Sequence, residues 1–278
     1  MAAQPLDVAL DLLRRLPPSN IVSNLSTLVS LFPHLADDLY SSVDQPLQVR
    51  VDSSPEGKGR EYLICDYNRD GDSWRSHWSN LYDPPLKGGE EGATPSKELR
   101  QMEVKANEAF DTYRQLYFEG GLSSVYLWDL DVGFAGVVLI KREFSGASSA
   151  SWSAIHIVEV VPDSASSKTF SYKLTSTVML RLERSAGSAE SKLGSIDLGG
   201  SLTRQAEQNS QAADADAHIV NIGKMVESLE SSIRNNIQEI YFGKTRDIVG
   251  MLRSIDNLEE ARKADNLRRE LMAKMRRP

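Results

Sequence analysis

The hydrophobic pattern of the first third of the chain predicts three short helices. In each segment, apolar residues recur every three or four positions, which is the spacing of one helix face. A proline follows each segment and ends it, because proline cannot continue a helix. The three segments are 6–16, 21–31 and 35–43. We therefore expect an N-terminal helical bundle, or stalk, over residues 1–46.

The next region, residues 47–118, has a mixed pattern. A short strand is predicted at 60–66, where Tyr62 and Ile64 share one face. The stretch 68–92 is rich in turn-forming and aromatic residues. An amphipathic helix is predicted over 96–118, ended by the glycine pair that follows it.

Residues 119–205 have the pattern of a sheet. Apolar and β-branched runs of strand length alternate with short connections that carry Gly, Ser, Asp or Pro. Because parallel strands need long crossovers, short connections predict an antiparallel meander. The five predicted strands are 123–130, 134–142, 152–161, 168–183 and 195–204. A polar linker is expected to follow over 205–217.

The strongest periodicity in the chain predicts a long helix over 218–254, within a region 206–256. Its apolar residues step by three and four from Ile219 to Ile240. Such a helix would be about 55 Å long, whereas five strands side by side span only about 24 Å. Either the helix breaks at Gly243 or Gly250, or a second chain continues the sheet; we favour the second chain.

Residues 257–278 predict a terminal amphipathic helix with a basic polar side. Residues 258–277 contain seven Lys or Arg and four Asp or Glu. Their apolar residues occupy one half of the helical wheel. Such a helix either packs on its own domain or lays its apolar side in a groove of a binding partner. Both possibilities remain open at this point.

Composition narrows the class of protein. The chain has 278 residues, 40% hydrophobic and 26% charged, as in folded α+β proteins. Its net charge of -7 argues against nonspecific nucleic-acid binding. A single cysteine, Cys65, excludes an internal disulfide, which fits a reducing compartment. The longest apolar run, 134–140, is too short for a membrane helix. We expect a cytoplasmic protein.

Two motifs resemble ligand-binding sequences but are better explained as elements of local backbone structure. Residues 66–72 have oxygen ligands at alternate positions and a glycine sixth, as a calcium loop does, but the twelfth position is His77 instead of glutamate. A tight turn is favoured. Gly243-Lys244-Thr245 lacks the upstream glycine of a phosphate-binding loop. The four histidines lack metal-ligand spacing, and no catalytic pair is evident, so we expect neither a metal site nor an enzyme.

Several stretches together resemble the beta subunit of F-actin-capping protein. The most distinctive is Cys-Asp-Tyr-Asn-Arg-Asp-Gly-Asp-Ser at 65–73. Others are Ala-Leu-Asp-Leu-Leu-Arg-Arg-Leu-Pro-Pro at 9–18, Ser-Val-Tyr-Leu-Trp-Asp-Leu-Asp at 124–131 and Glu-Ile-Tyr-Phe-Gly-Lys-Thr at 239–245. The resemblance extends from about residue 6 to about residue 255.

The resemblance implies a heterodimer with a homologous alpha subunit. Each subunit would give five antiparallel strands to one ten-stranded sheet, with the long helices across it. The heterodimer would bind the barbed end of an actin filament, independently of calcium, and block addition and loss of subunits. No cofactor, nucleotide or covalent step is implied, and the expected location is the cortical actin cytoskeleton.

The resemblance also assigns candidate site residues. The C-terminal segment 257–278 would be an actin-binding arm, and its basic residues could also meet phosphoinositides. Regulators carrying a capping-protein-interaction motif would bind at Arg15, Asp44 and Tyr82. The expected actin-binding residues are Leu258, Arg262, Leu267, Arg268, Leu271, Met272 and Met275. The alternative function is a non-enzymatic regulatory adaptor whose basic tail docks on a membrane.

Overall fold

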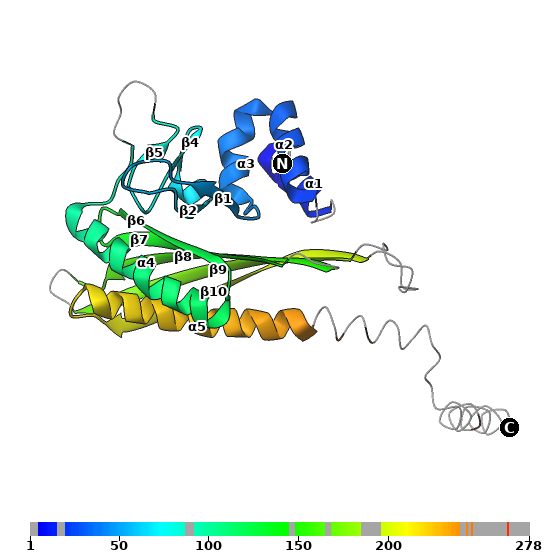
Figure 1. The fold of residues 1–278 in the computed structure, drawn as a ribbon. Coiled ribbons are helices and arrows are strands. Elements are labelled where there is room, and N and C mark those ends of the chain that lie inside the picture. The colour runs from blue at the N-terminus through cyan, green and yellow to red at the C-terminus, as the bar shows by residue number, and fades with distance from the viewer. Residues whose placement is uncertain are drawn as a thin grey trace. The chain divides into compact units, whose positions relative to one another are not determined.

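A computed structural model describes residues 5–15, 20–86, 92–144, 148–164, 168–184 and 196–239, together with Gly243, Arg246 and Asn266. The chain divides into two compact units, 1–233 and 234–278. Nearly all of the described residues belong to the first unit (Figure 1). No helix in these described ranges has the length and apolar character needed to cross a membrane.

The N-terminal helices occupy the three segments in which the sequence predicts them. They are α1 (Pro5–Arg15), α2 (Ile21–Leu31) and α3 (Ala36–Ser42), with a 3-10 turn, η2 (Pro33–Leu35), before the last. Their apolar faces meet around four buried residues, Ala9, Leu25, Leu28 and Leu39. The period of three and four residues therefore marks the side of each helix that packs against the others.

Two small sheets follow in the region that the sequence analysis left mostly irregular. β1 (Gln48–Val51) pairs with β2 (Glu61–Ile64), and β2 was predicted whereas β1 was not. A 3-10 turn, η3 (Asp66–Asn68), leads into a three-stranded sheet of β3 (Arg69–Asp70), β4 (Ser73–Arg75) and β5 (Tyr82–Asp83). Strands of two or three residues are too short to show an alternating pattern.

The main sheet is an antiparallel meander of five strands in the order β10-β9-β8-β7-β6. This confirms the predicted meander. The strands are β6 (Leu122–Asp129), β7 (Phe134–Phe144), β8 (Ser148–Pro162), β9 (Thr169–Arg184) and β10 (Ile196–Gln211).

The predicted polar linker at 205–217 was wrong in its first half. β10 continues to Gln211, which pairs with Thr169 of β9. Apart from Ala206, the residues from Gln205 to Gln211 are polar, and most of them are exposed at the margin of the sheet. A strand at that position needs one partner and no apolar face, so polarity alone does not identify a linker.

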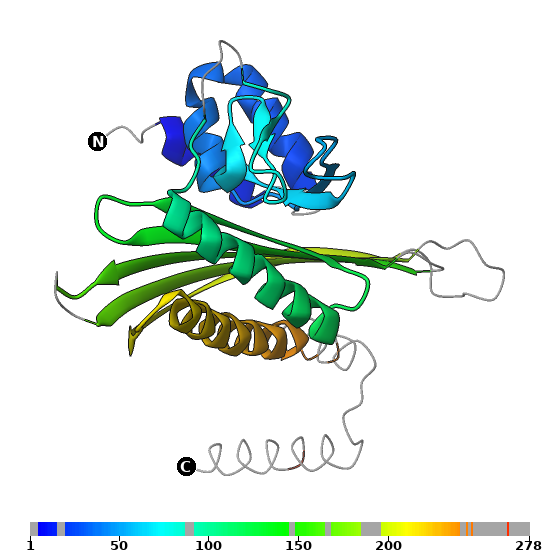
Figure 2. The same cartoon turned by 60° about the vertical axis from the view of Figure 1, so that its left-hand side comes forward.

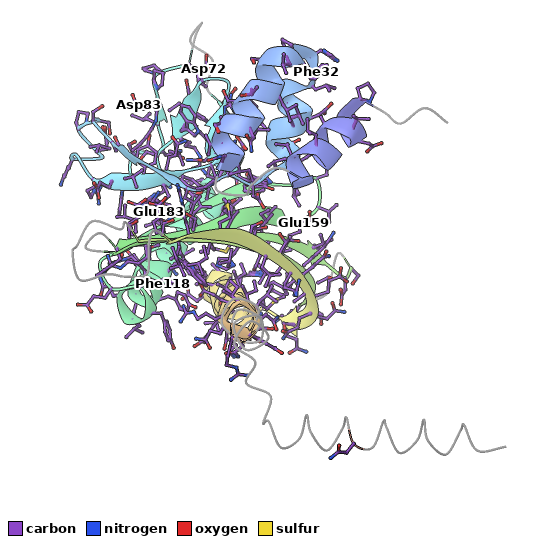
Figure 3. The ribbon with its side chains drawn as sticks, turned by 90° about the vertical axis from the view of Figure 1, so that its right-hand side faces the viewer. Phe32, Asp72, Asp83, Phe118, Glu159 and Glu183 are labelled. Atoms are coloured by element: carbon purple, nitrogen blue, oxygen red, sulfur yellow. The ribbon has the colours of Figure 1, made fainter. Side chains whose placement is uncertain are left out.

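The main sheet has different cover on its two faces. α4 (Lys97–Tyr117) and α5 (Ala215–Gln238) lie on one face, and the N-terminal helices and small sheets lie on the other (Figures 1 and 2). The view in Figure 3 looks along α5 and shows the sheet curving over it. On the N-terminal side, the core is built by Leu47, Leu63, Tyr126, Val137, Leu139, Ile155 and Met179.

The long helix begins three residues earlier than predicted. The 24 residues of α5 make it about 36 Å long. It passes obliquely under the strands (Figures 1 and 2), and its buried residues include Val226 and Ile233. The remainder of the predicted helix, 240–254, lies almost entirely outside the described residues.

Candidate functional site

One edge of the main sheet, that of β6, is closed by side chains. The amide of Asn107 on α4 brackets Val125 as a neighbouring strand would: its Nδ2 donates to Val125 O at 2.9 Å, and Val125 N donates to its Oδ1 at 2.9 Å. Both outward-facing backbone groups of Val125 are therefore satisfied without another strand.

A buried ion cluster closes the same edge two residues further along. Leu127 N donates to Glu103 Oε2 at 2.6 Å, and Arg75 Nη2 donates to Leu127 O at 3.3 Å. The Arg75 guanidinium also donates to both oxygens of Glu103, at 2.9 and 2.8 Å. Arg100 forms an ion pair with the same carboxylate. Glu103 is fully buried. Through these contacts the cluster joins Arg75 of β4, Glu103 of α4 and Leu127 of β6.

The opposite edge, that of β10, has no such cover. In an antiparallel sheet, the backbone N–H and C=O groups of successive residues point to opposite sides of their strand. The backbone groups of Val125 point outward from β6, and the strand registers carry this alternation across the sheet. It follows that the odd-numbered residues of β10 have outward-facing backbone groups. Their exposed members include Ser201, Thr203, Gln205, Glu207 and Asn209. Among the residues that the structure describes, no strand pairs with this side of β10.

Only two contacts touch the outward carbonyls of β10 within the described ranges. The exposed Arg204 side chain donates to Thr203 O at 3.0 Å, and Asn221 of α5 donates to Gln211 O at 3.0 Å. We call the outer side of β10, from Ser201 to Asn209, the open edge, and that of β6 the closed edge. An unpaired strand edge of this length is a template for strand addition by another chain.

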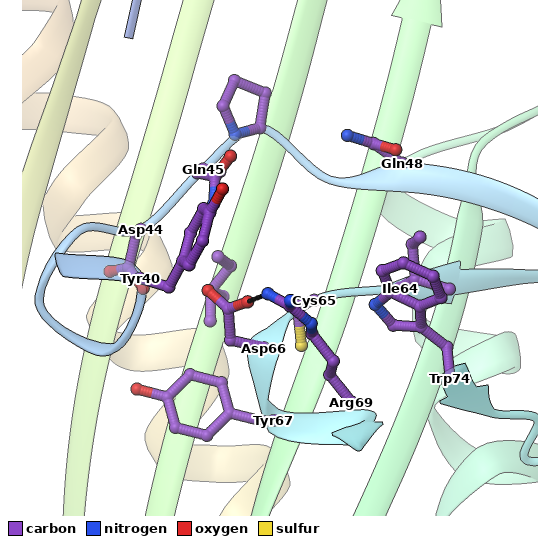
Figure 4. A pocket seen from close by; sticks show the side chains of 12 residues that line it. Tyr40, Asp44, Gln45, Gln48, Ile64, Cys65, Asp66, Tyr67, Arg69 and Trp74 are labelled. Atoms are coloured by element: carbon purple, nitrogen blue, oxygen red, sulfur yellow. Dashed lines mark hydrogen bonds and ion pairs between the residues drawn. The ribbon is translucent and has the colours of Figure 1, made fainter. Parts of the chain in front are cut away.

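A pocket of about 270 Å³ lies between the N-terminal helices, the small sheets and the main sheet. Figure 4 shows Asp44, Cys65 and Asp66 in it, with the aromatic rings of Tyr40, Tyr67 and Trp74 around them. Asp44 is one of the three residues that the family resemblance predicts to bind regulators. The aromatic side chains had not been connected with it, because they come from three separate elements.

The two carboxylates give this pocket an electrostatic preference. Burial raises the pKa of Asp44, although a hydrogen bond with Thr177 counteracts the effect. Burial also raises the pKa of Asp66, against the lowering effect of Arg69, whose Nη1 lies 3.4 Å from Asp66 Oδ1. The charge of Asp44 adds to the rise at Asp66. Arg69 already partners Asp66 and lies over the rings of Tyr40 and Trp74, so a further cationic group entering the pocket would chiefly relieve Asp44.

The other predicted site residues are not brought into this pocket. Tyr82 lies on β5 and its hydroxyl donates to Ala93 O at 2.9 Å; it does not line the pocket. Arg15 is the last residue of α1, and its side chain is outside the description. The seven predicted actin-binding residues, Leu258, Arg262, Leu267, Arg268, Leu271, Met272 and Met275, also lie outside the described residues.

The calcium-like motif has a structural role. Gly71 has a φ of 55° and turns the chain between β3 and β4. This agrees with the tight turn predicted from the sequence. Cys65 N donates to Asn68 Oδ1 at 2.9 Å, and Asn68 Nδ2 donates to Arg75 O at 2.9 Å. Burial raises the pKa of the Cys65 thiol to about 12. No group of three His, Cys, Asp or Glu in the described ranges could hold a metal ion.

These features define an α+β protein built on a meander sheet, with one edge closed by its own side chains and the other available to a second chain. Comparison with known proteins identifies its family. The family model described as F-actin capping protein, beta subunit, matches residues 6–249. The chain belongs to this family, which confirms the resemblance found in the sequence.

Curated relatives match over nearly their whole length. The F-actin-capping protein subunit beta of Gibberella zeae is 50% identical and covers 99% of this chain and 100% of its own. The protein of the same name from Drosophila melanogaster is 51% identical, and the match covers 98% of this chain and 96% of the relative. A solved structure, the homodimeric actin capping protein alpha subunit of Plasmodium berghei, matches at 14% identity with a TM-score of 0.47. The match covers 90% of this chain and 96% of that structure's chain.

Proposed function

We propose that this chain is one half of a heterodimeric cap for the barbed end of actin filaments. Membership of the beta-subunit family supports this function, and so do the names of its relatives. The observation that carries it is the contrast between the two sheet edges, because an assembly subunit needs one place where a second chain completes its fold.

The proposed partner is an alpha subunit whose edge strand pairs with β10. The outward-facing amides and carbonyls from Ser201 to Asn209 would then enter a ladder like the one that β10 already makes with β9. A partner that contributes five strands of its own would make a sheet of ten strands. No proline interrupts β10, and its two charged residues in this stretch, Arg204 and Glu207, are exposed.

The proposed contact with actin is the C-terminal segment 257–278. On sequence grounds, its apolar half, including Leu267, Leu271 and Met275, would enter an apolar groove on a terminal actin subunit. Each buried side chain contributes up to about 1.5–3 kcal/mol, and ordering the segment costs about 2–5 kcal/mol. A single arm would therefore bind weakly, and a second contact made by the same rigid dimer would strengthen binding about 10²–10⁴-fold.

The proposed mechanism is steric occupation of the filament end. The bound dimer covers the surface to which the next subunit would add, and its grip on terminal subunits slows their loss. The proposal involves no catalytic step, cofactor or calcium, and it locates the dimer at the cortical actin cytoskeleton. The basic residues of the arm, such as Arg262 and Arg268, would also attract anionic lipid head groups, including phosphoinositides.

Regulators with a capping-protein-interaction motif are proposed to bind near Asp44, together with Arg15 and Tyr82. The support is the pocket itself, in which the half-buried carboxylate of Asp44 favours a cationic side chain beside Arg69, which already engages Asp66 and the rings of Tyr40 and Trp74. Replacing Asp44 with Asn should weaken the binding of a basic regulator peptide about tenfold, with Asp72→Asn in the exposed β3–β4 turn as the control.

The test of capping uses the chain co-expressed with an alpha subunit. Elongation of pyrene-labelled actin from preformed seeds should stop when complex and seeds are equimolar. Unchanged elongation would reject capping. Sedimentation with vesicles containing phosphoinositides separates the alternative, a membrane-docking adaptor, which would bind vesicles strongly and leave elongation unaffected.

Truncation after Ser254 tests the role of the arm separately. Assembly with the partner should be unchanged, because β10 and α5 remain intact. The affinity for barbed ends should fall about 10²-fold, because the avidity contribution of one arm is removed. Equal affinity before and after truncation would show that the arm is not an actin contact.

A further inference from the structure

His218 lies in the first turn of α5 and fastens the start of this helix to the main sheet. Its Nδ1 is 2.8 Å from the hydroxyl of Tyr172 on β9. The ring packs edge-to-face against Phe170, with centroids 4.6 Å apart, and against Phe134 of β7 at 5.3 Å. One histidine side chain therefore joins α5 to two strands.

A third side chain favours one direction for the hydrogen bond between Tyr172 and His218. Asn221 Nδ2, one turn further along α5, donates to Tyr172 Oη at 3.1 Å and to Gln211 O at 3.0 Å. Asn221 occupies one of the two lone pairs of the hydroxyl oxygen, so the arrangement that also gives the hydroxyl proton a partner has Tyr172 donating it to His218 Nδ1. In that arrangement Nδ1 is the acceptor, and the histidine is neutral with its proton on Nε2.

The surroundings oppose a positive charge on the ring. β7 and β9 present Phe134, Phe170 and Tyr172 to it, and a cation at a helix N-terminus is unfavourable. Burial accordingly lowers the pKa of His218, although the nearby Asp214 raises it.

The charged groups of the same helix start are already engaged. Asp214 Oδ1 accepts a hydrogen bond from Ala217 N at 2.9 Å. Asp216 is paired with Lys105 of α4 at 2.7 Å. Neither carboxylate forms a direct contact with the His218 ring among the interactions of the described residues, so a proton there gains little compensation.

We propose that His218, Tyr172 and Asn221 form an acid-sensitive latch that holds the start of α5 against the sheet. Protonation of Nδ1 removes the acceptor of the Tyr172 proton and places a positive charge among the three aromatic rings, which weakens this contact. The first turn of α5 then separates from β9, and the Asn221 contact that holds Gln211 at the end of β10 is lost with it. This device depends on the fold alone and would operate whether or not the chain caps actin.

The pH range follows from linkage. The folded-state pKa of His218 lies below its unfolded value, which is about 6.5. The stabilisation is therefore complete above about pH 6.5 and is lost as the pH falls towards the folded-state pKa. Opening should increase by up to about tenfold for each pH unit in this range.

Hydrogen exchange of the full chain, co-purified with its partner, tests the latch. After correction for the intrinsic pH dependence of exchange, peptides covering 212–223 should exchange several-fold faster at pH 5.5 than at pH 7.5. His218→Gln, which cannot be protonated, should abolish this response, and Tyr172→Phe, which keeps the His218 ring partly buried but removes its hydrogen-bond donor, should reduce it. His34→Gln, at an exposed histidine of η2, should retain it.

A retained response in His218→Gln, or no response in the unmodified chain, would overturn the proposal. The state of the ring provides a second test that needs no variant. Nitrogen NMR of His218 at pH 7.5 should show the tautomer with the proton on Nε2. The tautomer with the proton on Nδ1, or a charged ring, would contradict the latch. Both outcomes are independent of actin elongation, so they do not depend on the proposed capping function.

Discussion

The two edge strands of the five-stranded sheet, β6 and β10, differ in whether their outward-facing backbone groups are satisfied by the chain itself. Both strands present outward-facing amides and carbonyls that need partners. At β6, the chain supplies them itself, through Asn107 to Val125 and through Glu103 and Arg75 to Leu127. At β10, outward-facing backbone groups alternate from Ser201 to Asn209, and within the described part of the chain the exposed Arg204 side chain, on Thr203 O, is the one side-chain contact to them.

This difference shows how one polypeptide can limit strand addition to a single side. Closing an edge with side chains requires a helix beside it and polar groups at the right spacing, because an unsatisfied buried group costs about 1–3 kcal/mol. Glu103 and Asn107 lie one turn apart on α4 and meet alternate residues of β6. A sheet closed in this way on one side can grow only from β10.

The largest effect on this comparison should come from Glu103→Ala. The substitution leaves Arg75 buried without its carboxylate and Leu127 N without an acceptor, so the free energy of unfolding should fall by about 3–5 kcal/mol. Denaturant unfolding of the purified protein measures this loss. Glu108→Ala, at an exposed position of the same helix, is the matched control. A loss below about 1 kcal/mol would mean that the cluster does not hold the closed edge.

At the open edge, Gln205→Pro should separate folding from assembly. The Gln205 N–H faces outward, so proline there removes no bond to β9 but obstructs an added strand. Assembly with the alpha subunit should weaken about 10–100-fold, because a buried acceptor of the partner is left unpaired, whereas the thermal stability of the chain changes little. Analytical ultracentrifugation measures the assembly.

Gln208→Pro is the complementary variant for the open edge. Its N–H faces β9, so proline at this position should destabilise the fold itself. If Gln205→Pro assembled as well as the unsubstituted chain, β10 would not be the pairing strand.

A smaller effect is expected for Asn107→Ala at the closed edge. Removing the amide leaves Val125 N and Val125 O without partners, which should lower the free energy of unfolding by about 1–3 kcal/mol. Exchange of the Val125 amide should accelerate at the same time. Asn107→Asp keeps an acceptor for Val125 N and should recover part of the loss. Equal stability of both variants and the unsubstituted chain would show that the bracket contributes nothing.

The smallest effect should come from Arg204→Ala at the open edge. The guanidinium contact with Thr203 O is exposed, so its removal should change the free energy of unfolding by less than about 0.5 kcal/mol. A larger change would show that the open edge is partly closed by its own side chain, which would weaken the contrast with β6. Thermal unfolding of this variant beside Arg204→Lys measures the difference.

Periodicity was sufficient to predict the helices and the meander. The apolar steps of 6–16, 21–31 and 35–43 correspond to α1, α2 and α3, and the short connections correspond to an antiparallel sheet. It failed where polar residues form a strand at a margin, as in the last third of β10, and where strands are as short as β3 or β5. In those places tertiary pairing, and not local pattern, determines the structure.

The sites were less predictable than the fold. Family resemblance selected Asp44 but could not show that Tyr40, Trp74 and Asp66 share its pocket, because these residues are distant in sequence or on different elements. The roles of Glu103 and Asn107 were not recognised either. A glutamate and an asparagine at positions i and i+4 of an amphipathic helix are ordinary surface residues unless the facing strand is known.

Hydrogen exchange of β10 amides in the co-purified complex tests the central claim most directly. If a partner strand occupies the open edge, the outward amides of Thr203, Gln205 and Glu207 should be protected as strongly as the inward amides of Arg204 and Ala206. Fast exchange of the outward amides, with the inward ones protected, would show that β10 remains an edge in the assembled protein and would contradict the account.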